Sequence, residues 1–117
     1  MTNWKASGRL QMPGDVCVCL SDQGSLTISF YEDDSDFNGN DFEYSYSLDA
    51  ESTELFLKKI PHRNEDAKKD IGEWLEENIN CGGLGYDLKE MWIWMGLHGS
   101  YLIKEDYPAG ICTKQSF

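Results

Sequence analysis

Four cysteines are the residues of this chain best suited to metal or redox chemistry: Cys17, Cys19, Cys81 and Cys112. Cys17 and Cys19 lie two residues apart in a β-branched run, so both are expected on one face of a strand. Neighbouring positions on one face of a strand rarely form a disulfide. Two C-x-x-C pairs, the spacing typical of structural zinc, are absent from the sequence. We therefore predict reduced structural thiols, with no metal site and no cofactor.

A second candidate metal site is the segment from Asp34 to Gly39, which reads D-x-D-x-N-G like the first half of a calcium loop. Alternating oxygen ligands and a glycine at the sharp turn suit a hard cation. However, Ser45 occupies the position that should supply the bidentate glutamate, and the segment joins two expected strands instead of two helices. Asn-Gly is also a strong tight-turn signal. The sequence favours a hairpin turn here, and calcium binding is the open alternative.

No arrangement of side chains points to catalysis. His62 and His98 are the two histidines, and neither lies near a nucleophile pattern. The chain has 21 Asp and Glu residues, so pairs of carboxylates are expected by chance and do not indicate acid–base chemistry. Nucleophile-elbow, phosphate-loop and zinc-protease motifs are absent from the sequence. We therefore expect a protein that is not an enzyme.

The distribution of charge is the most informative feature of the sequence. The 117 residues include 10 Lys and Arg against 21 Asp and Glu, a net charge of −11. Residues 31–60 account for −7 of this charge, because nine acidic residues there accompany only Lys58 and Lys59. No basic residue lies between Arg9 and Lys58. A charge of this sign argues against direct binding to nucleic-acid phosphates.

Aromatic residues alternate with the acidic ones in the same segment. Carboxylates can steer a cationic protein toward a surface, and aromatic rings supply contact area at low entropic cost. A solvated acidic face that only maintains solubility would carry the same charge, and charge alone does not separate these two interpretations. The predicted partner-binding residues are Asp33, Asp34, Asp36, Phe37, Asp41, Glu43, Tyr44 and Tyr46.

The first half of the chain has the alternation expected of β-strands. Val16–Leu20 is a short β-branched run, and residues 25–31 and 41–48 alternate apolar with polar side chains. Turn signals separate the three runs, which predicts an antiparallel meander. A weaker strand over residues 9–12 and a return to the sheet at residues 100–103 would extend it.

The second half of the chain changes to a helical period. Residues 51–59 suit a short helix, because acidic residues come first and lysines last. Residues 64–79 carry apolar side chains at helical spacing, with Asn64 as the expected N-cap and Gly82-Gly83 as the end of the element. This second helix is the clearest element in the sequence.

Residues 87–97 are predicted to form a third helix. The run from Asp87 to Glu90 has the spacing of a capping box, and the apolar residues after it follow helical periodicity. Gly99 is the expected residue that ends the helix. Trp-Ile-Trp also suits a buried strand over residues 91–95, and that alternative stays open.

Together these elements predict a single α+β domain over residues 1–117. It contains an antiparallel sheet of three to four strands packed against two to three helices, with an irregular tail from Pro108. The longest apolar runs are only a few residues, and residues 1–12 lack the apolar region of a secretory signal. We therefore expect a cytoplasmic protein with no membrane partner.

A small, strongly acidic α+β domain without a signal or catalytic residues resembles the immunity proteins of bacterial contact-dependent or polymorphic toxin systems. The resemblance is one of whole-chain character: acidity concentrated over residues 32–54, aromatic residues among the acids, and compact length. It implies a cytoplasmic inhibitor that binds a cationic toxin domain stoichiometrically. The toxin is expected to be a nuclease, since nucleases are cationic in order to bind phosphates.

Two other functions are compatible with the sequence. An acidic mimic of nucleic acid, acting on a DNA-binding protein, would place carboxylates along one face with the spacing of phosphates. A small-molecule-binding domain or enzyme would use a pocket lined by Trp92, Trp94 and Tyr101. Trp92 belongs to the apolar stripe of the expected third helix, whereas Trp94 lies off that stripe and is a candidate for exposure.

Overall fold

A computed structural model describes residues 8–12, 16–34, 40–79, 84–105 and 111–117. Within these ranges, only the backbone is described at residues 31–34, 40–42, 84–86, 104–105 and 111–113.

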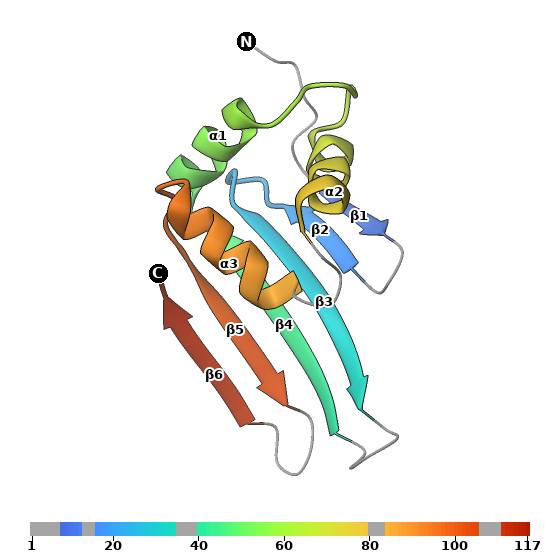
Figure 1. Cartoon of the computed structure of the whole chain (residues 1–117), viewed down its shortest axis with the longest axis vertical. Coiled ribbons are helices and arrows are strands. Elements are labelled where there is room, and N and C mark those ends of the chain that lie inside the picture. The colour runs from blue at the N-terminus through green and yellow to red at the C-terminus, as the bar shows by residue number, and fades with distance from the viewer. Residues whose placement is uncertain (1–7, 13–15, 35–39, 80–83, 106–110) are drawn as a thin grey trace.

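Six antiparallel strands form one sheet, and three helices lie over one of its faces (Figure 1). The strands are paired in chain order, and the helices are inserted between the fourth and fifth strands. Strands and helices follow the order β1 (Gly8–Met12), β2 (Val16–Leu20), β3 (Leu26–Asp34), β4 (Asn40–Leu48), α1 (Ala50–Lys59), α2 (Ala67–Asn78), α3 (Leu84–Trp94), β5 (Gly99–Glu105) and β6 (Ile111–Ser116).

The predicted α+β class is confirmed, and the sheet is larger than the predicted three to four strands. Residues 9–12 and 100–103 belong to β1 and β5, as the sequence suggested. The prediction of an irregular tail was wrong, because residues 111–116 form the edge strand β6 paired with β5. The β6 sequence, ICTKQS, has no clear alternation of its own. Its conformation depends on a non-local partner strand, which sequence patterns do not report.

The strand register divides the sheet into an apolar and a polar face. Directly paired residues point to the same side of a sheet, and successive residues point to opposite sides. The face under the helices therefore carries apolar side chains, all of them buried: Val18, Leu20, Leu26, Ile28, Tyr46 and Leu48. The opposite face carries hydroxyl side chains that hydrogen-bond across strands, Thr27 with Ser47 and Ser29 with Ser45.

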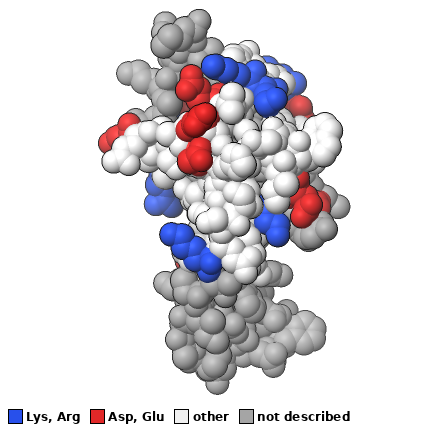
Figure 2. Space-filling model, turned by 90° about the vertical axis from the view of Figure 1, so that its left-hand side faces the viewer, with Lys and Arg blue, Asp and Glu red and all other residues white. Residues whose placement is uncertain are grey.

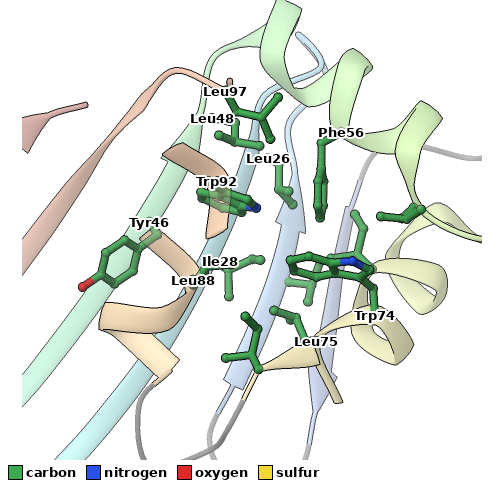
Figure 3. Packing of buried hydrophobic residues seen from close by; sticks show 14 of the residues in the cluster. Leu26, Ile28, Tyr46, Leu48, Phe56, Trp74, Leu75, Leu88, Trp92 and Leu97 are labelled. Atoms are coloured by element: carbon green, nitrogen blue, oxygen red, sulfur yellow. The ribbon is translucent and has the colours of Figure 1, made fainter. Parts of the chain in front are cut away.

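One aromatic residue from each helix joins the helical layer above the sheet (Figure 3). The ring centroid of Phe56 on α1 lies 4.9 Å from that of Trp74 on α2 and 5.9 Å from that of Trp92 on α3, edge to face in both cases. Trp92 and Phe56 are fully buried.

Residues 84–94 form the helix α3, which confirms the predicted helix over the alternative strand.

The helix starts depend on aspartate side chains. Asp49 caps α1 by accepting the backbone N–H of Ser52, and Asp66 caps α2 by accepting that of Lys68. Asn64, the predicted cap of α2, instead donates its side-chain N–H to the buried carboxylate of Asp70. Both Asn and Asp are good caps, and the Asn64 side chain is engaged with Asp70 and Glu73 instead.

A glycine ends α3, but not the predicted one. Gly96 has a φ of +80° and donates its N–H to the carbonyl of Ile93. Gly99 instead begins β5, where an added Cβ would collide with the carbonyl oxygen of Ser47 on β4. Gly82-Gly83, the predicted end of the second helix, lies outside the described residues.

The two longest strands extend beyond the helical layer. β3 and β4 have nine residues each, and Figure 1 shows their distal ends projecting past all of the helices. In the described parts of the chain, no helix has the length and apolar character that crossing a membrane requires.

Candidate protein-binding surface

Those predicted acidic residues that belong to the described strands lie at the end of the sheet that the helices leave uncovered (Figure 1). Asp33 and Asp34 are the last residues of β3, and Asp41 is the second residue of β4. The register pairs Asp33 directly with Asp41, and Glu43 follows two positions further along β4. The hairpin therefore brings acidic residues from two parts of the sequence to the same end of two paired strands.

Strand β5 adds one acidic and one basic position to this end of the sheet. Glu105 pairs with Phe42, and Lys104 pairs with Glu43. In the described register, pairing with β5 begins at Phe42, so Asp41 has no partner position there. We call Glu32, Asp33, Asp34, Asp41, Glu43 and Glu105 the acidic end.

Several predicted sites fall outside what the structure describes. Asp36 and Phe37, together with the rest of the calcium-like turn up to Gly39, lie in the gap between β3 and β4. Cys81 lies outside the described residues as well, and only the backbone of Cys112 is described. The described side chains contain no group of three or more potential metal ligands.

Cys17 and Cys19 share one face of β2, as the sequence predicted, and the register shows that this is the face opposite the helices. Both are free thiols, and Cys17 is buried. The Arg9 Nε donates a hydrogen bond to the Cys17 Sγ over 3.4 Å. This hydrogen bond, followed by electrostatic attraction to the same side chain, raises the pKa of the Arg9 guanidinium above its ordinary value.

The two predicted tyrosines have different surroundings. Tyr44 is half-buried. Tyr46 is only 5 % exposed, so its ring belongs to the core and is removed from the predicted contact surface. Strand alternation placed both rings on one face correctly, but it could not indicate how far the helices cover that face. Burial raises the pKa of the Tyr46 phenol, and the electrostatic effect of the nearby Tyr101 raises it further.

Four rings form an aromatic ladder across β3, β4 and β5: Phe30, Tyr44, Tyr46 and Tyr101. The Phe30 and Tyr44 centroids are 4.7 Å apart, and those of Tyr46 and Tyr101 are 5.6 Å apart. Phe30, Tyr44 and Tyr101 are all partly exposed. By register, the ladder runs from the core under α3 toward the acidic end. The predicted partner-binding residues did not include Phe30, which precedes the acidic run by two residues, and Tyr101 was predicted only as part of a ligand pocket.

The pocket proposed from Trp92, Trp94 and Tyr101 is not formed by these residues. Trp92 is fully buried and Trp94 is 84 % exposed, so their side chains do not line one cavity. A shallow pocket of about 190 Å³ lies elsewhere, between β1 and α2, where Leu10, Gly72 and Glu73 contribute to its lining. Ligand pockets are typically larger, roughly 300–1,000 Å³. This pocket is smaller than that range.

The described surface on the β6 side of the molecule is mostly uncharged in its middle. Figure 2 shows acidic and basic side chains near the upper, helical end of this side, a largely uncharged middle, and further basic and acidic side chains at the flanks lower down. Three ion pairs are recorded among the described side chains, Glu54 with Lys58, Arg63 with Glu77, and Asp66 with Lys68. All three involve helices or the loop between them, so the basic residues near the helices partly neutralise that end.

Comparison with known proteins found no matching family model, no matching curated protein and no matching solved structure. The function is therefore inferred from the geometry of this surface.

Proposed function

We propose that this protein is an immunity-type inhibitor that neutralises a cationic toxin domain by stoichiometric binding, with a nuclease as the expected toxin. The observation that carries the proposal is the position of the charge. The acidic end lies beyond the helical layer, and no basic residue occurs in the sequence between Arg9 and Lys58. This is the part of the molecule where a partner can approach without contacting the helices.

Charge and aromatic contact area occur together at this position. A concentrated field of carboxylates raises the encounter rate with a cationic partner by roughly 10-fold to 1,000-fold. The partly exposed rings of Phe30 and Tyr44 offer rigid contact area near the acidic end, on the face of the sheet that the helices partly cover. By register, positions 32 and 34 share this face, whereas positions 33, 41 and 43 belong to the opposite face, so a partner must reach both sides of the hairpin. A nuclease must be cationic to bind phosphates, so an acidic inhibitor can use the same field.

Binding of a cation would also relieve repulsion within the hairpin. Asp33 and Asp41 occupy directly paired positions. Like charges at such positions destabilise a strand pair by roughly 0.2–1 kcal/mol. A partner that supplies Lys or Arg there converts this cost into a contribution to affinity. The repulsion is present in the free protein and is relieved in the complex, which favours binding.

An acidic mimic of nucleic acid is the alternative function that would also use this negative charge. Mimicry needs a row of carboxylates that follows the spacing of phosphates along a face. The register instead groups the acidic positions at one end of the sheet, while hydroxyl residues occupy the central positions of the uncovered face. A compact contact with a folded partner fits this arrangement better than a long phosphate-like row.

The experiment is a rescue and binding assay with the toxin domain encoded beside the gene for this chain. An acidic-end variant carries Asp33→Asn, Asp34→Asn and Asp41→Asn. A matched control variant carries Glu51→Gln, Glu65→Gln and Glu76→Gln, three exposed residues near the helices. Both variants change the net charge by the same amount.

Wild type and the matched control variant should bind the toxin domain in a one-to-one complex and restore growth of cells that express it. The acidic-end variant should bind at least about ten-fold more weakly and fail to restore growth. Circular dichroism of all three proteins checks that the fold is retained. Equal binding by the acidic-end variant would show that the contact lies elsewhere.

A further inference from the structure

The outward side of α3 carries the most exposed large apolar side chain of the described residues. Trp94 is 84 % exposed and the adjacent Ile93 is 46 % exposed, although Trp92 between the helix and the sheet is fully buried. An indole at this exposure leaves most of its apolar surface in water, which is costly unless a partner covers it. Tryptophan is also among the residues most enriched at the centres of binding interfaces.

A carboxylate lies beside this indole. Glu90 is exposed and precedes Trp94 by four residues, so the two side chains are neighbours on the helix surface. Glu90 is in none of the ion pairs recorded among the described side chains. The nearest lysine in sequence, Lys89, instead places its Nζ 5.0 Å from the ring centroid of Tyr101 on the sheet side. The negative charge of Glu90 is thus not neutralised by its sequence neighbour.

The end of the helix adds further negative potential at the same place. Trp94 is the last residue of α3, where the helix dipole is negative. The last turn of α3 contains no basic residue that would offset this potential. A carboxylate, an electron-rich indole face and a helix C-terminus therefore converge on one exposed spot. All three favour a cation.

We infer that Glu90 and Trp94 form a receptor for an arginine side chain of a cationic partner protein. A guanidinium is planar, stacks on an indole face and can donate to a carboxylate at the same time, which a lysine ammonium does less well. The inference rests on the proposed function for the existence of such a partner. It adds a second contact, on the helical side of the molecule and separate from the acidic end.

Charge selects this occupant over two others. A second copy of the chain also carries a net charge of −11 and would be repelled. An anionic membrane surface would be repelled for the same reason, and the outward face of α3 lacks the lysines that interfacial helices use. A cationic protein surface is complementary to both the local and the total charge.

The test uses the full-length acidic-end variant, so that binding at the hairpin does not mask the helix site. Nitrogen-15 NMR follows the indole N–H signal of Trp94, assigned by its loss in Trp94→Phe. Hexa-arginine and hexa-lysine peptides are titrated at low salt. Glu90→Gln removes the carboxylate, and Leu55→Ala, which truncates another exposed apolar residue, serves as the control.

Hexa-arginine should shift the Trp94 signal more than hexa-lysine does. Isothermal titration calorimetry gives the affinity for all variants, including Trp94→Ala, which lacks the indole signal. Trp94→Ala and Glu90→Gln should each weaken hexa-arginine binding roughly two- to five-fold, the range expected for an exposed cation–π contact, while Leu55→Ala leaves it unchanged. Equal shifts with both peptides, no shift of Trp94, or concentration-dependent dimerisation through Trp94 would each overturn the inference. None of these outcomes depends on how the acidic end binds a toxin, so the two proposals fail separately.

Discussion

At the scale of single residues, Trp92 and Trp94 show how two neighbouring tryptophans acquire opposite roles. Trp92 packs against Phe56 with no exposure, whereas Trp94 is 84 % exposed. We predict that Trp92→Ala lowers the free energy of unfolding by about 3–5 kcal/mol through cavity formation. Trp94→Ala should change it by less than about 0.5 kcal/mol. Urea unfolding followed by circular dichroism measures both, and similar losses in the two variants would contradict the assignment.

Tyr46 gives a prediction in the alkaline range. Burial raises its pKa, so the neutral phenol is favoured in the folded state. Its contribution to stability should be fully present below the ordinary tyrosine pKa of about 10 and should be lost as the pH rises through the higher folded value. Ultraviolet titration should show a tyrosine component that ionises above the ordinary range. That late component should disappear in Tyr46→Phe, and its persistence would assign it to another residue.

At the scale of elements, the start of α2 depends on Asp66. Burial acts to raise the pKa of this carboxyl, but hydrogen bonds and attraction from Lys68 outweigh it, so the pKa is lowered. Asp66→Ala should cost about 1 kcal/mol of stability at neutral pH through loss of the cap. Because the pKa is lower in the folded state, this contribution is present above the ordinary aspartate value and is lost as the pH falls through the folded value.

Thermal unfolding of wild type and Asp66→Ala over a series of pH values checks this prediction. The difference between the two proteins should shrink as the pH falls below about 4. Asn64→Ala provides a contrast, because Asn64 contacts the Asp70 carboxylate and does not cap the helix. A difference that stays constant into strong acid would exclude the charged cap as its cause.

The elements that local patterns could predict are those with strong periodicity. The helix of residues 67–78 follows from its apolar spacing, and strands β2, β3 and β4 follow from β-branched runs and alternation. Strand β6 could not be predicted in this way, because its partner β5 rather than its own pattern determines its structure. The start of α2 and the end of α3 could not be placed from the sequence. The Asn64 side chain binds Asp70 instead of capping α2, and Gly96, which has a positive φ, ends α3.

The candidate surface was predictable to a similar extent. The acidic run in the sequence does lie at one end of paired strands, because a hairpin brings its two arms together. The burial of Tyr46 was not predictable, since alternation identifies a face but not the length of strand that helices cover. The exposure of Trp94 did follow from its position off the apolar stripe of α3.

At the scale of the whole molecule, the fold separates the hydrophobic core from the acidic positions along the sheet. The helices and the apolar face of β2, β3 and β4 form the core, while the distal ends of β3 and β4 carry the acidic positions beyond it. Substitutions at the acidic end should therefore alter binding with little effect on stability. Relief of like-charge repulsion between the paired positions Asp33 and Asp41 should make the acidic-end variant equal to or slightly more stable than wild type, by up to about 1 kcal/mol.

The most direct test of the central claim is the association rate constant with the toxin domain, measured by stopped-flow fluorescence at increasing salt concentration. For wild type and the matched control variant, the rate should be high at low salt and should fall steeply as the Debye length shortens. The acidic-end variant should associate at least about ten-fold more slowly at low salt, with a shallower salt dependence. If both variants slow association equally, or if no protein shows a dependence on salt, the acidic end is not the surface that captures the partner.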